Sequence, residues 1–388
     1  MARMKNRKRI VVYCQPLSGA GHYVRSREIV RTLSCRHQVH FVSGGRPVPG
    51  PPLDRSVQSV ELPAIYRTPQ GLKPVAAGRT IEDVLAERQR ILARELREIR
   101  PDVLVIEHFP FSKWDLQPEV LAAIEAARGA NPGVDVVCSV RDYPGSSEMA
   151  RFPNRFEAQV VAILNEHFSA LLVHSDPRIV RLESQFAWIK KISIPIHYTG
   201  YVSEKLPQAV SARDDREGDY VLVSSGGLAD GLRLAILCSA AWRRLDEQGA
   251  TAGRRMLIFA GLFADACQYE VLERTLGDGP FCLRRFTGDF LQWMPAARLS
   301  VSQGGYNTTM NVLETRTRAI VAPNRRMTDQ TLRAQNLAER GLLDVIDPET
   351  ITVEQLADRM MQGLARPLPE HCIALDGAGR TAELIDAL

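Results

Sequence analysis

The sequence predicts an α/β protein built from two Rossmann-like, doubly wound parallel sheets that face a cleft. Its 388 residues exceed one typical domain and favour two. Short apolar runs alternate with helical patterns along the chain, and this alternation is typical of parallel sheets covered by helices. Between Gly200 and Gly218 apolar periodicity is lost and charge is gained, which indicates a linker.

The composition is that of an ordinary globular protein, with 45% hydrophobic and 24% charged residues. No apolar run approaches the roughly 18 residues that span a bilayer. The basic amino terminus leads directly into a strand and lacks the apolar core of a signal peptide, so we expect a cytoplasmic protein.

The formal charge of +4 is concentrated at the amino terminus, where five cations leave about −1 for the remainder (4 − 5): Arg3, Lys5, Arg7, Lys8 and Arg9. We therefore expect no nucleic-acid partner. A solvated basic tail is favoured, and a peripheral contact with anionic lipid stays open. Seven scattered cysteines without C-x-x-C spacing predict reduced, mostly buried thiols and no metal site.

The first half begins with a β-branched run, Arg9–Cys14, which meets a loop containing Gly19 and Gly21 and then a helix. A second strand follows over Gln38–Ser43. The Pro- and Gly-rich stretch 46–78 shows only one clear strand, Val57–Leu62, and is expected to be a lid, an acceptor-binding surface or partly mobile.

Further strands in this half end in polar residues. A helix over Ile81–Ile99, opened by Thr80 and Asp83, precedes the strand Val103–Ile106, which Glu107 and His108 follow. Ligands bind at the carboxyl ends of parallel strands, so Glu107 and His108 are candidate site residues, although a buried structural pair is equally open. Two later strands repeat the pattern, Val134–Val140 before Arg141-Asp142 and Ala170–His174 before Ser175-Asp176.

The second half contains two Gly pairs between a strand and a helix. Gly226-Gly227 follows the strand Tyr220–Ser224, and Gly304-Gly305 follows Leu299–Ser302. Uncovered backbone N–H groups and the helix dipole at such starts can hold a phosphate, with the hydroxyls of Thr308 and Thr309 beside the second pair. Further strands are expected over Met256–Ala260, Cys282–Phe286 and Ala319–Ala322, and a final helical pattern runs from about His371.

The second half of the chain resembles the donor half of GT-B glycosyltransferases. The resemblance lies in a Gly loop, Asn-Thr, a helix, a strand that ends in Pro323, and then Asp329-Gln330. The resemblance is to family 28, the group that includes the N-acetylglucosaminyltransferase of peptidoglycan synthesis, and especially to a branch of predicted glycosyltransferases. It implies an amino-terminal acceptor domain over 1–205, a nucleotide-sugar donor domain over 217–370, and a helix over 371–388 that packs back on the first domain.

The resemblance also implies residue roles. Gly19 and Gly21 would form the acceptor or phosphate loop, and Thr287 would lie at the nucleobase. Asp329 and Gln330 would hold the donor sugar. Asn311 stands where the family usually has a ribose-binding Glu, which leaves the choice of donor open; Glu314 is one turn further on.

The expected reaction is transfer of a hexose from a nucleotide-diphosphate donor, UDP-sugar first, to a hydroxyl or amine, with inversion. His22 is the candidate base, since a helix start keeps its imidazole neutral, and Glu107 or His108 would orient or replace it; a non-catalytic contact of His22 stays open. The chain has no D-x-D motif, so we expect metal-independent catalysis, with the nucleotide sugar as co-substrate and no cofactor. The expected acceptor is a small molecule or a lipid-linked sugar.

Two other classes remain. A nucleotide-sugar epimerase or hydrolase of the same architecture would need additional carboxylates, for which Glu107, Asp142 and Asp176 are candidates. A non-catalytic nucleotide-sugar binding protein is hinted at only by Asn311.

Overall fold

The computed structural model describes residues 7–50, 52–144, 153–207, 219–226, 229–262 and 264–388. Gly227 and the basic residues Arg3 and Lys5 therefore lie outside the described residues. The chain divides into two compact units. Unit 1 comprises Met1–Val48, Pro52–Ser203 and Ile373–Leu388, and unit 2 comprises Pro49–Pro51 and Glu204–Cys372.

Unit 1 is built on a seven-stranded sheet in the order β3-β2-β1-β6-β7-β8-β9, with every neighbouring pair parallel. The strands are β1 (Arg9–Cys14), β2 (Gln38–Ser43), β3 (Val57–Glu61), β6 (Val103–Glu107), β7 (Asp135–Arg141), β8 (Ala170–His174) and β9 (Ile196–Tyr198). The helices are α1 (Gly21–Ser34), α2 (Ile81–Ile99), α3 (Gln117–Ala130), α5 (Pro153–His167) and α11 (Gly377–Ala387).

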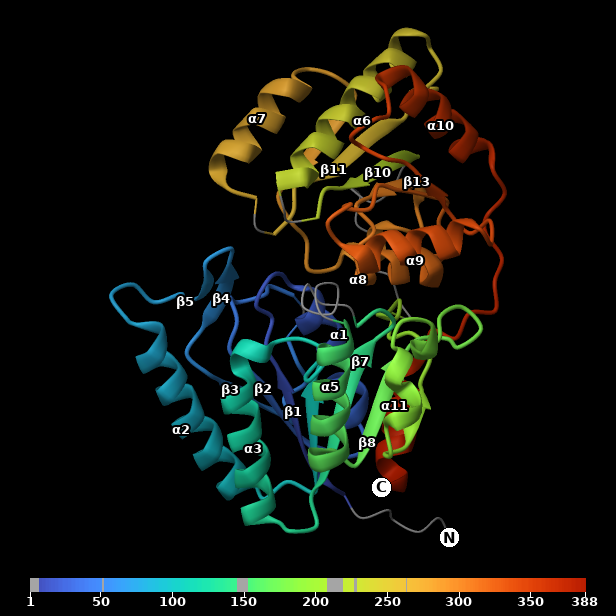
Figure 1. The fold of residues 1–388 in the computed structure, drawn as a ribbon. Coiled ribbons are helices and arrows are strands. Elements are labelled where there is room, and N and C mark those ends of the chain that lie inside the picture. The colour runs from blue at the N-terminus through green and yellow to red at the C-terminus, as the bar shows by residue number, and fades with distance from the viewer. Residues whose placement is uncertain (1–6, 51, 145–152, 208–218, 227–228, 263) are drawn as a thin grey trace. The chain divides into compact units, whose positions relative to one another are not determined.

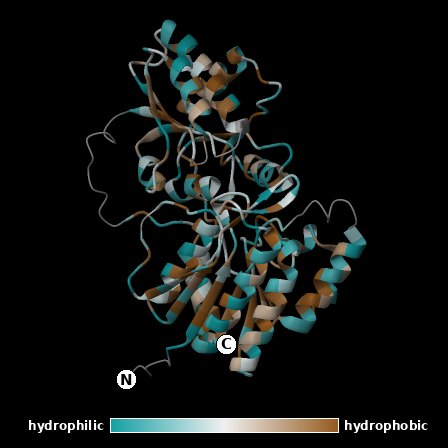
Figure 2. Cartoon of the chain, turned by 90° about the vertical axis from the view of Figure 1, so that its left-hand side faces the viewer, coloured by the Kyte–Doolittle hydropathy of each residue, from teal (hydrophilic) through white to brown (hydrophobic). Residues whose placement is uncertain are grey.

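The two faces of this sheet bury alternate residues of each strand. Val11 and Tyr13 of β1 belong to the core beneath α2, α3 and α5, whereas Ile10 and Val12 belong to the core beneath α1 and α11. Figure 1 shows α2, α3 and α5 together on one side of the sheet, and Figure 2 shows the apolar colouring concentrated on its strands. Burial on both faces explains why these strands read as nearly continuous apolar runs.

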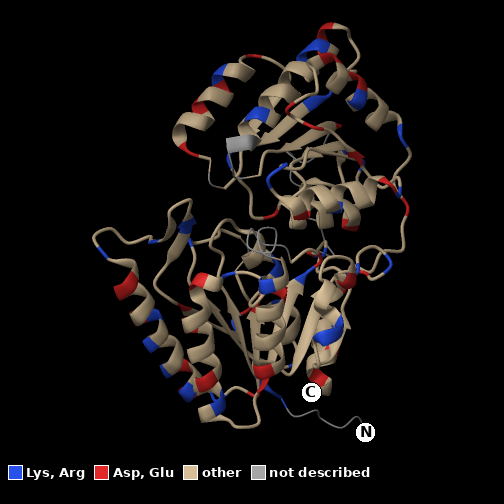
Figure 3. Ribbon diagram, viewed as in Figure 1, with Lys and Arg blue, Asp and Glu red and all other residues tan. Residues whose placement is uncertain are grey.

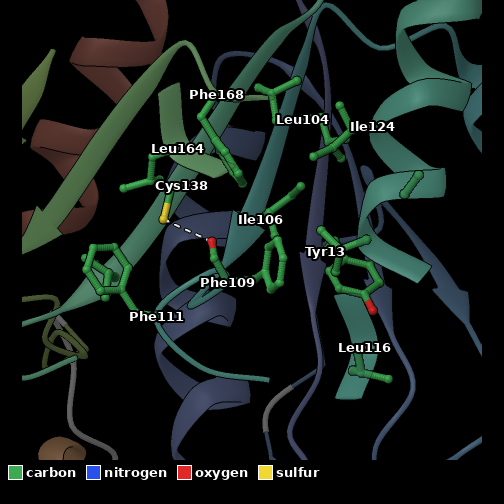
Figure 4. Packing of buried hydrophobic residues seen from close by; sticks show 14 of the residues in the cluster. Tyr13, Leu104, Ile106, Phe109, Phe111, Leu116, Ile124, Cys138, Leu164 and Phe168 are labelled. Atoms are coloured by element: carbon green, nitrogen blue, oxygen red, sulfur yellow. Dashed lines mark hydrogen bonds between the residues drawn. The ribbon is translucent and has the colours of Figure 1, made fainter. Parts of the chain in front are cut away.

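The core beneath α2, α3 and α5 also contains the loop that follows β6. Figure 4 shows Phe109 beside Ile106 and Phe111 on the side of Leu164 and Cys138, and the Cys138 thiol donates to the Phe109 carbonyl at 3.2 Å. Both phenylalanines are at most 1% exposed. This packing ties the loop, which carries His108 and Lys113, to the sheet.

Unit 2 has a six-stranded sheet in the order β12-β11-β10-β13-β14-β15, again parallel throughout. The strands are β10 (Tyr220–Ser224), β11 (Arg255–Phe259), β12 (Phe281–Arg284), β13 (Ala297–Ser302), β14 (Ala319–Val321) and β15 (Asp344–Val345). The helices are α6 (Ala229–Glu247), α7 (Ala266–Leu276), α8 (Tyr306–Thr315), α9 (Thr328–Ala338) and α10 (Val353–Ala365). Figure 1 shows α6, α7 and α10 apart from α8 and α9, so helices cover both faces.

One prediction for the stretch 46–78 is wrong, because it contains more than one strand. Ile65–Thr68 (β4) and Gly71–Pro74 (β5) form an antiparallel hairpin after β3. Gly71 has φ 116°, which its turn requires and which glycine adopts without strain. Ile65 is completely buried, so the Pro- and Gly-rich composition concealed an element that packs on the core.

Several boundaries also differ from the expectations. The helix after β10 begins at Ala229 rather than near Leu232, and the last helix begins at Gly377 rather than near His371. Other strands begin or end one or two residues away from their predicted bounds, namely β6, β7, β11, β12, β13 and β14. The expectation that most cysteines are buried is wrong, since only Cys14, Cys138 and Cys238 are buried; all seven are free thiols.

The carboxyl-terminal segment belongs to unit 1 and is held there by backbone contacts. Tyr201 N–H donates to the Ala374 carbonyl at 2.8 Å, and Gly377 N–H donates to the Tyr201 carbonyl at 2.9 Å. A Cβ on Gly377 would lie 2.5 Å from the Gly200 carbonyl oxygen, so the close approach requires glycine. The following helix α11 buries Ala382 and Ile385 in the core shared with α1.

Candidate active site

In unit 1, the structure brings His22 and Glu107 together, although they are 85 positions apart in the sequence. His22 is the second residue of α1, and Glu107 is the last residue of β6, the strand that pairs with β1. His22 Nδ1 lies 2.6 Å from Glu107 Oε1. The His22 side chain is 24% exposed and the Glu107 side chain only 1%, so the imidazole forms the accessible part of the pair.

Two cations hold the carboxylate of Glu107. Arg25 Nη2 donates to Oε1, and Lys113 Nζ donates to Oε2. Burial acts to raise the pKa of Glu107, but His22, Lys113 and Arg25 outweigh it and hold that pKa well below its usual range. Glu107 is therefore an anion at neutral pH.

His22 is neutral at the same pH. Burial lowers the pKa of His22 to about 4; Glu107 opposes this shift, and Lys113 and Arg141 add to it. A neutral ring beside a carboxylate donates Nδ1–H to it, which leaves Nε2 as the ring atom that can accept a proton. The pair can therefore act as a general base that the carboxylate orients.

His108 lies against His22 but takes a different position. Its ring meets the His22 ring edge-on with centroids 5.1 Å apart, and its Nδ1 lies 2.9 Å from Ser112 Oγ. The side chain is 2% exposed, and burial holds its pKa well below the usual value. Among the described residues Nε2 of His108 has no hydrogen-bond partner. Of the two predicted partners of His22, Glu107 makes the hydrogen bond and His108 packs on the ring.

The glycines of the amino-terminal loop lie beside this pair in the chain. Gly19 has φ 147° and open space where a Cβ would be, and Gly21 is the exposed first residue of α1. Their predicted role in binding an acceptor or a phosphate stays a prediction.

In unit 2, the predicted nucleotide and sugar residues follow neighbouring strands. The register aligns Ser224 of β10 with Ser302 of β13, and Ser302 with Val321 of β14. Gly226, the pair Gly304-Gly305 and the pair Asp329-Gln330 follow these three strands. Because the strands are parallel and end at the same level, these residues share one edge of the sheet.

The start of α8 has the features of an anion site only in part. Gly305 precedes the helix, and no side chain caps it. Gly304 has φ 71°, and a Cβ there would lie 2.3 Å from Val321 Cγ1, whereas a Cβ on Gly305 would meet nothing within 4 Å. Thr308 is partly exposed. Thr309 is not available as predicted, because it is 1% exposed and its hydroxyl donates to the Gly305 carbonyl at 3.0 Å.

The start of α9 holds the residues predicted to bind the sugar. Asp329 Oδ2 accepts from Arg333 Nη2 at 3.3 Å, and Gln330 Oε1 accepts from Asn324 N–H at 3.2 Å. One oxygen of each side chain is thus engaged within the loop and helix.

Asn311 and Thr287 complete the predicted nucleotide residues. Asn311 is 4% exposed, and its Oδ1 has no partner within the described part of the chain. The hydroxyl of Thr287 donates to Asp289, in the turn that follows β12. Glu314 is engaged by Lys205 at 2.9 Å. A buried amide oxygen without a partner costs free energy, so a ligand hydroxyl at Asn311 would relieve that cost.

Three residues of these sites were not predicted. Arg25 and Lys113 hold Glu107, and in unit 2 Gln303 connects the end of β10 with the first turn of α6. The Gln303 side-chain amide nitrogen donates to the Ser225 carbonyl at 3.0 Å. In this orientation the Gln303 side-chain oxygen accepts from Gly231 N–H at 2.9 Å. Arg25 lies one helical turn after His22 and could have been found from that spacing. Lys113 and Gln303 carry no such signal.

The additional carboxylates considered for a hydrolase or epimerase are deeply buried. Asp176 is 1% exposed, pairs with Arg178 and accepts from Ala374 N–H at 2.9 Å, so it fastens the carboxyl-terminal segment. Asp142 is completely buried and accepts from the Tyr143 N–H at 3.0 Å. Neither contact indicates a catalytic role.

The described residues contain no group of three or more His, Cys, Asp or Glu side chains arranged to hold a metal ion. None of their helices combines the length and the apolar character needed to cross a membrane. Figure 3 shows Lys and Arg interspersed with Asp and Glu along α2, the most highly charged helix of unit 1 in sequence.

Comparison with known families matches residues 270–370 to the Glycosyltransferase family 28 C-terminal domain. An uncharacterized glycosyltransferase of Methanopyrus kandleri is 21% identical over 207 residues, which are 51% of this chain and 56% of that protein. The chain thus matches little more than half the length of this curated relative.

Solved structures extend the similarity to both sheets. MurG of Acinetobacter baumannii superposes with a TM-score of 0.58 at 15% identity, covering 99% of this chain and 100% of that one. TcCGT1 in complex with UDP gives a TM-score of 0.61 at 12% identity, covering 98% and 94%. At these identities the likeness shows the fold, which is the two-sheet GT-B fold. The resemblance to family 28 is confirmed over residues 270–370.

Proposed function

We propose that this protein is a glycosyltransferase that moves a sugar from a nucleotide-diphosphate donor to a hydroxyl or amine acceptor. The observation that carries the proposal is the match of residues 270–370 to the family 28 domain. That range contains Gly304, Gly305, Asn311, Asp329 and Gln330, the residues predicted to hold the donor. A neighbour of the same fold is described in complex with UDP, which favours a UDP-sugar among the donors.

Unit 2 is proposed to hold the donor. The diphosphate would lie at the start of α8, where backbone N–H groups and the helix dipole stabilise negative charge, and Gly305 leaves room for its approach. The ribose would approach the unpartnered oxygen of Asn311. The hydroxyls of the donor sugar would bind to Asp329 and Gln330, a carboxylate that accepts and an amide that both donates and accepts.

Unit 1 is proposed to supply the base. Nε2 of His22 takes the proton of the acceptor as the acceptor oxygen or nitrogen forms its bond to the anomeric carbon. The bond from that carbon to the diphosphate breaks, and its electron pair leaves with the nucleotide. Attack opposite the leaving group inverts the anomeric configuration. Glu107 stabilises the imidazolium that forms.

A donor panel tests this proposal. The protein is incubated with UDP-, dTDP- and GDP-sugars plus candidate acceptors, and nucleotide release and sugar products are measured with and without a chelator. We expect nucleotide diphosphate and a glycosylated acceptor, and turnover that survives chelation because the helix starts supply the charge stabilisation. An epimerised free nucleotide sugar would support the isomerase class instead, and binding without turnover of any donor would support the binding-protein class.

His22→Ala tests the base within the same assay. We expect kcat to fall by roughly 10² to 10⁴, the usual span for loss of a general base, with donor affinity unchanged. His197→Ala, a partly exposed histidine of β9, is the matched control. Near-normal single-turnover chemistry in His22→Ala at saturating acceptor would remove His22 from the base role.

A further inference from the structure

The carboxylate of Glu107 is held by more positive charge than its own neutralisation requires. Arg25 Nη2 binds one carboxylate oxygen and Lys113 Nζ the other, and His22 shares the oxygen that Arg25 binds. The side chains of Arg25, Lys113 and Glu107 are 1%, 8% and 1% exposed. One cation would neutralise Glu107, and a second buried cation carries a desolvation cost. The second cation is therefore an unusual feature for a purely structural ion pair.

This inference rests on the proposed function of the His22–Glu107 pair. We propose that Arg25 and Lys113 are positioning residues for His22. By holding both oxygens of Glu107 they keep the carboxylate anionic and in one place, so that it accepts Nδ1–H of His22 and leaves Nε2 as the proton acceptor. Together with burial, the positive charge of Lys113 also keeps the imidazole unprotonated before the acceptor arrives.

The geometry explains why both cations are needed. Arg25 lies on α1, the helix that carries His22, so it fixes Glu107 relative to that helix. Lys113 comes from the loop after β6, which Phe109 and Phe111 anchor in the core (Figure 4). The carboxylate is therefore fixed from the helix and from the loop at once. With both oxygens engaged, it cannot rotate away from the ring without breaking a buried charged hydrogen bond.

Every neighbouring element contributes a group that faces this centre. Helix α1 contributes Arg25 and His22, and the loop after β6 contributes His108 and Lys113. The strands contribute one residue each: Cys14 from β1, Glu107 from β6, Arg141 from β7 and His174 from β8. Burial lowers the pKa values of His108 and His174 and raises that of the Cys14 thiol to about 12, so all three are uncharged at neutral pH. Besides burial, the charges that act on His22 are thus the carboxylate of Glu107 against the cations Lys113 and Arg141.

Removing single charges should therefore move the titration of His22 in opposite directions. Lys113 and Arg141 lower the pKa of His22 from its ordinary value, and Glu107 raises it. Lys113→Met is expected to raise the midpoint, and Glu107→Gln to lower it. A structural disturbance alone would expose the ring and move both variants the same way, toward the value of a free histidine.

The first test needs no activity. Histidine side chains of the full chain are labelled with ¹⁵N, His22 is assigned by its absence in His22→Ala, and its titration is followed by NMR. In the unmodified protein we expect the Nδ1-protonated tautomer and a midpoint of about 4. Lys113→Met should raise the midpoint by about one pH unit. Lys191→Met, a distant exposed lysine of unit 1, is the control and should leave it unchanged.

The second test uses turnover. The base form of His22 is present above its pKa and is lost as pH falls through it, so Lys113→Met should move the acid limb of kcat/KM to higher pH while donor affinity stays the same. Lys113→Arg, which keeps the charge, should restore the original limb.

Two results would overturn the inference. One is an Nε2-protonated tautomer of His22 in the unmodified protein, and the other is an unchanged midpoint in folded Lys113→Met. If that variant does not fold, Lys113→Gln, which keeps a donor for Oε2 without charge, is titrated in its place. Absence of turnover with every donor, accompanied by the expected NMR shifts, would count against the proposed function and leave the positioning role intact.

Discussion

At the scale of single residues, the site depends on polar groups whose partners come from distant parts of the chain. His22 obtains its orienting carboxylate from Glu107, and Glu107 obtains its cations from α1 and from the loop after β6. In unit 2, Asn311 is the reverse case, since its buried oxygen has no partner among the described residues. A group that is buried and unsatisfied in the free protein costs stability and favours a ligand that satisfies it.

Asn311→Ala should separate ligand binding from stability. Because the amide oxygen has no described partner and alanine favours the helix interior, we expect an unchanged or slightly higher Tm. If Asn311 binds the ribose, the Kd for UDP should rise about 3- to 10-fold, the equivalent of one net hydrogen bond. Calorimetric titration and thermal unfolding measure the two effects.

Asn336→Ala on α9 is the matched control, because Asn336 is partly exposed and lies in the following helix. A fall in Tm of many degrees with an unchanged Kd in Asn311→Ala would show that the amide is structural and that the ribose lies elsewhere.

At the scale of elements, the donor region is a set of strand-to-helix connections at one sheet edge. The parallel register brings the ends of β10, β13 and β14 level. The two glycines before α8 serve different needs. Gly304 has a positive φ and touches β14, whereas Gly305 has open space around its Cα.

Substitution of these two glycines should give opposite phenotypes. Gly304→Ala forces a left-handed conformation on a residue with a Cβ and an overlap with Val321, so we expect unit 2 to lose at least about 1–2 kcal/mol of stability. Gly305→Ala should fold normally. If a diphosphate packs on this backbone, however, its methyl group should weaken nucleotide binding by about tenfold.

Each variant serves as the control of the other, with thermal unfolding and nucleotide titration measured on both. Nucleotide binding by Gly305→Ala at full affinity would place the diphosphate away from the start of α8.

At the scale of the whole molecule, each unit has its own sheet and core, and the last segment of the chain returns to unit 1. The return depends on backbone pairing at Tyr201 and on the burial of α11 against α1. The carboxyl terminus is therefore part of the structure of unit 1.

Ile385→Ala tests this dependence. Ile385 is completely buried, and truncation of such a side chain costs about 2–5 kcal/mol. We expect faster hydrogen exchange in β1 and α1, with exchange in β10 and β13 unchanged, as measured by mass spectrometry. Leu388→Ala, exposed at the end of the chain, is the control. Equal acceleration in both units would contradict the assignment of α11 to the core of unit 1.

Local pattern alone predicted the class of fold and most strands. Runs such as Arg9–Cys14 and Tyr220–Ser224 are apolar on both faces. A strand buried on both faces requires that pattern, whereas a helix or an exposed strand does not. The Gly pair predicted the start of α8, and the polar residue after a strand predicted Glu107, because special backbone geometry and strand ends are local properties. His22 was predicted from its place at a helix start together with the family resemblance of its loop.

Only the tertiary structure decided which of these residues meet. Sequence spacing could not choose between Glu107 and His108 as the partner of His22, because that depends on the pairing of β1 with β6 and on the path of the following loop. The same reason explains why Lys113 and Gln303 were not predicted, because charge clusters and side-chain bridges arise from contacts between segments, and such contacts leave no periodicity in the chain. The β4–β5 hairpin was missed for a different reason, its Pro- and Gly-rich composition.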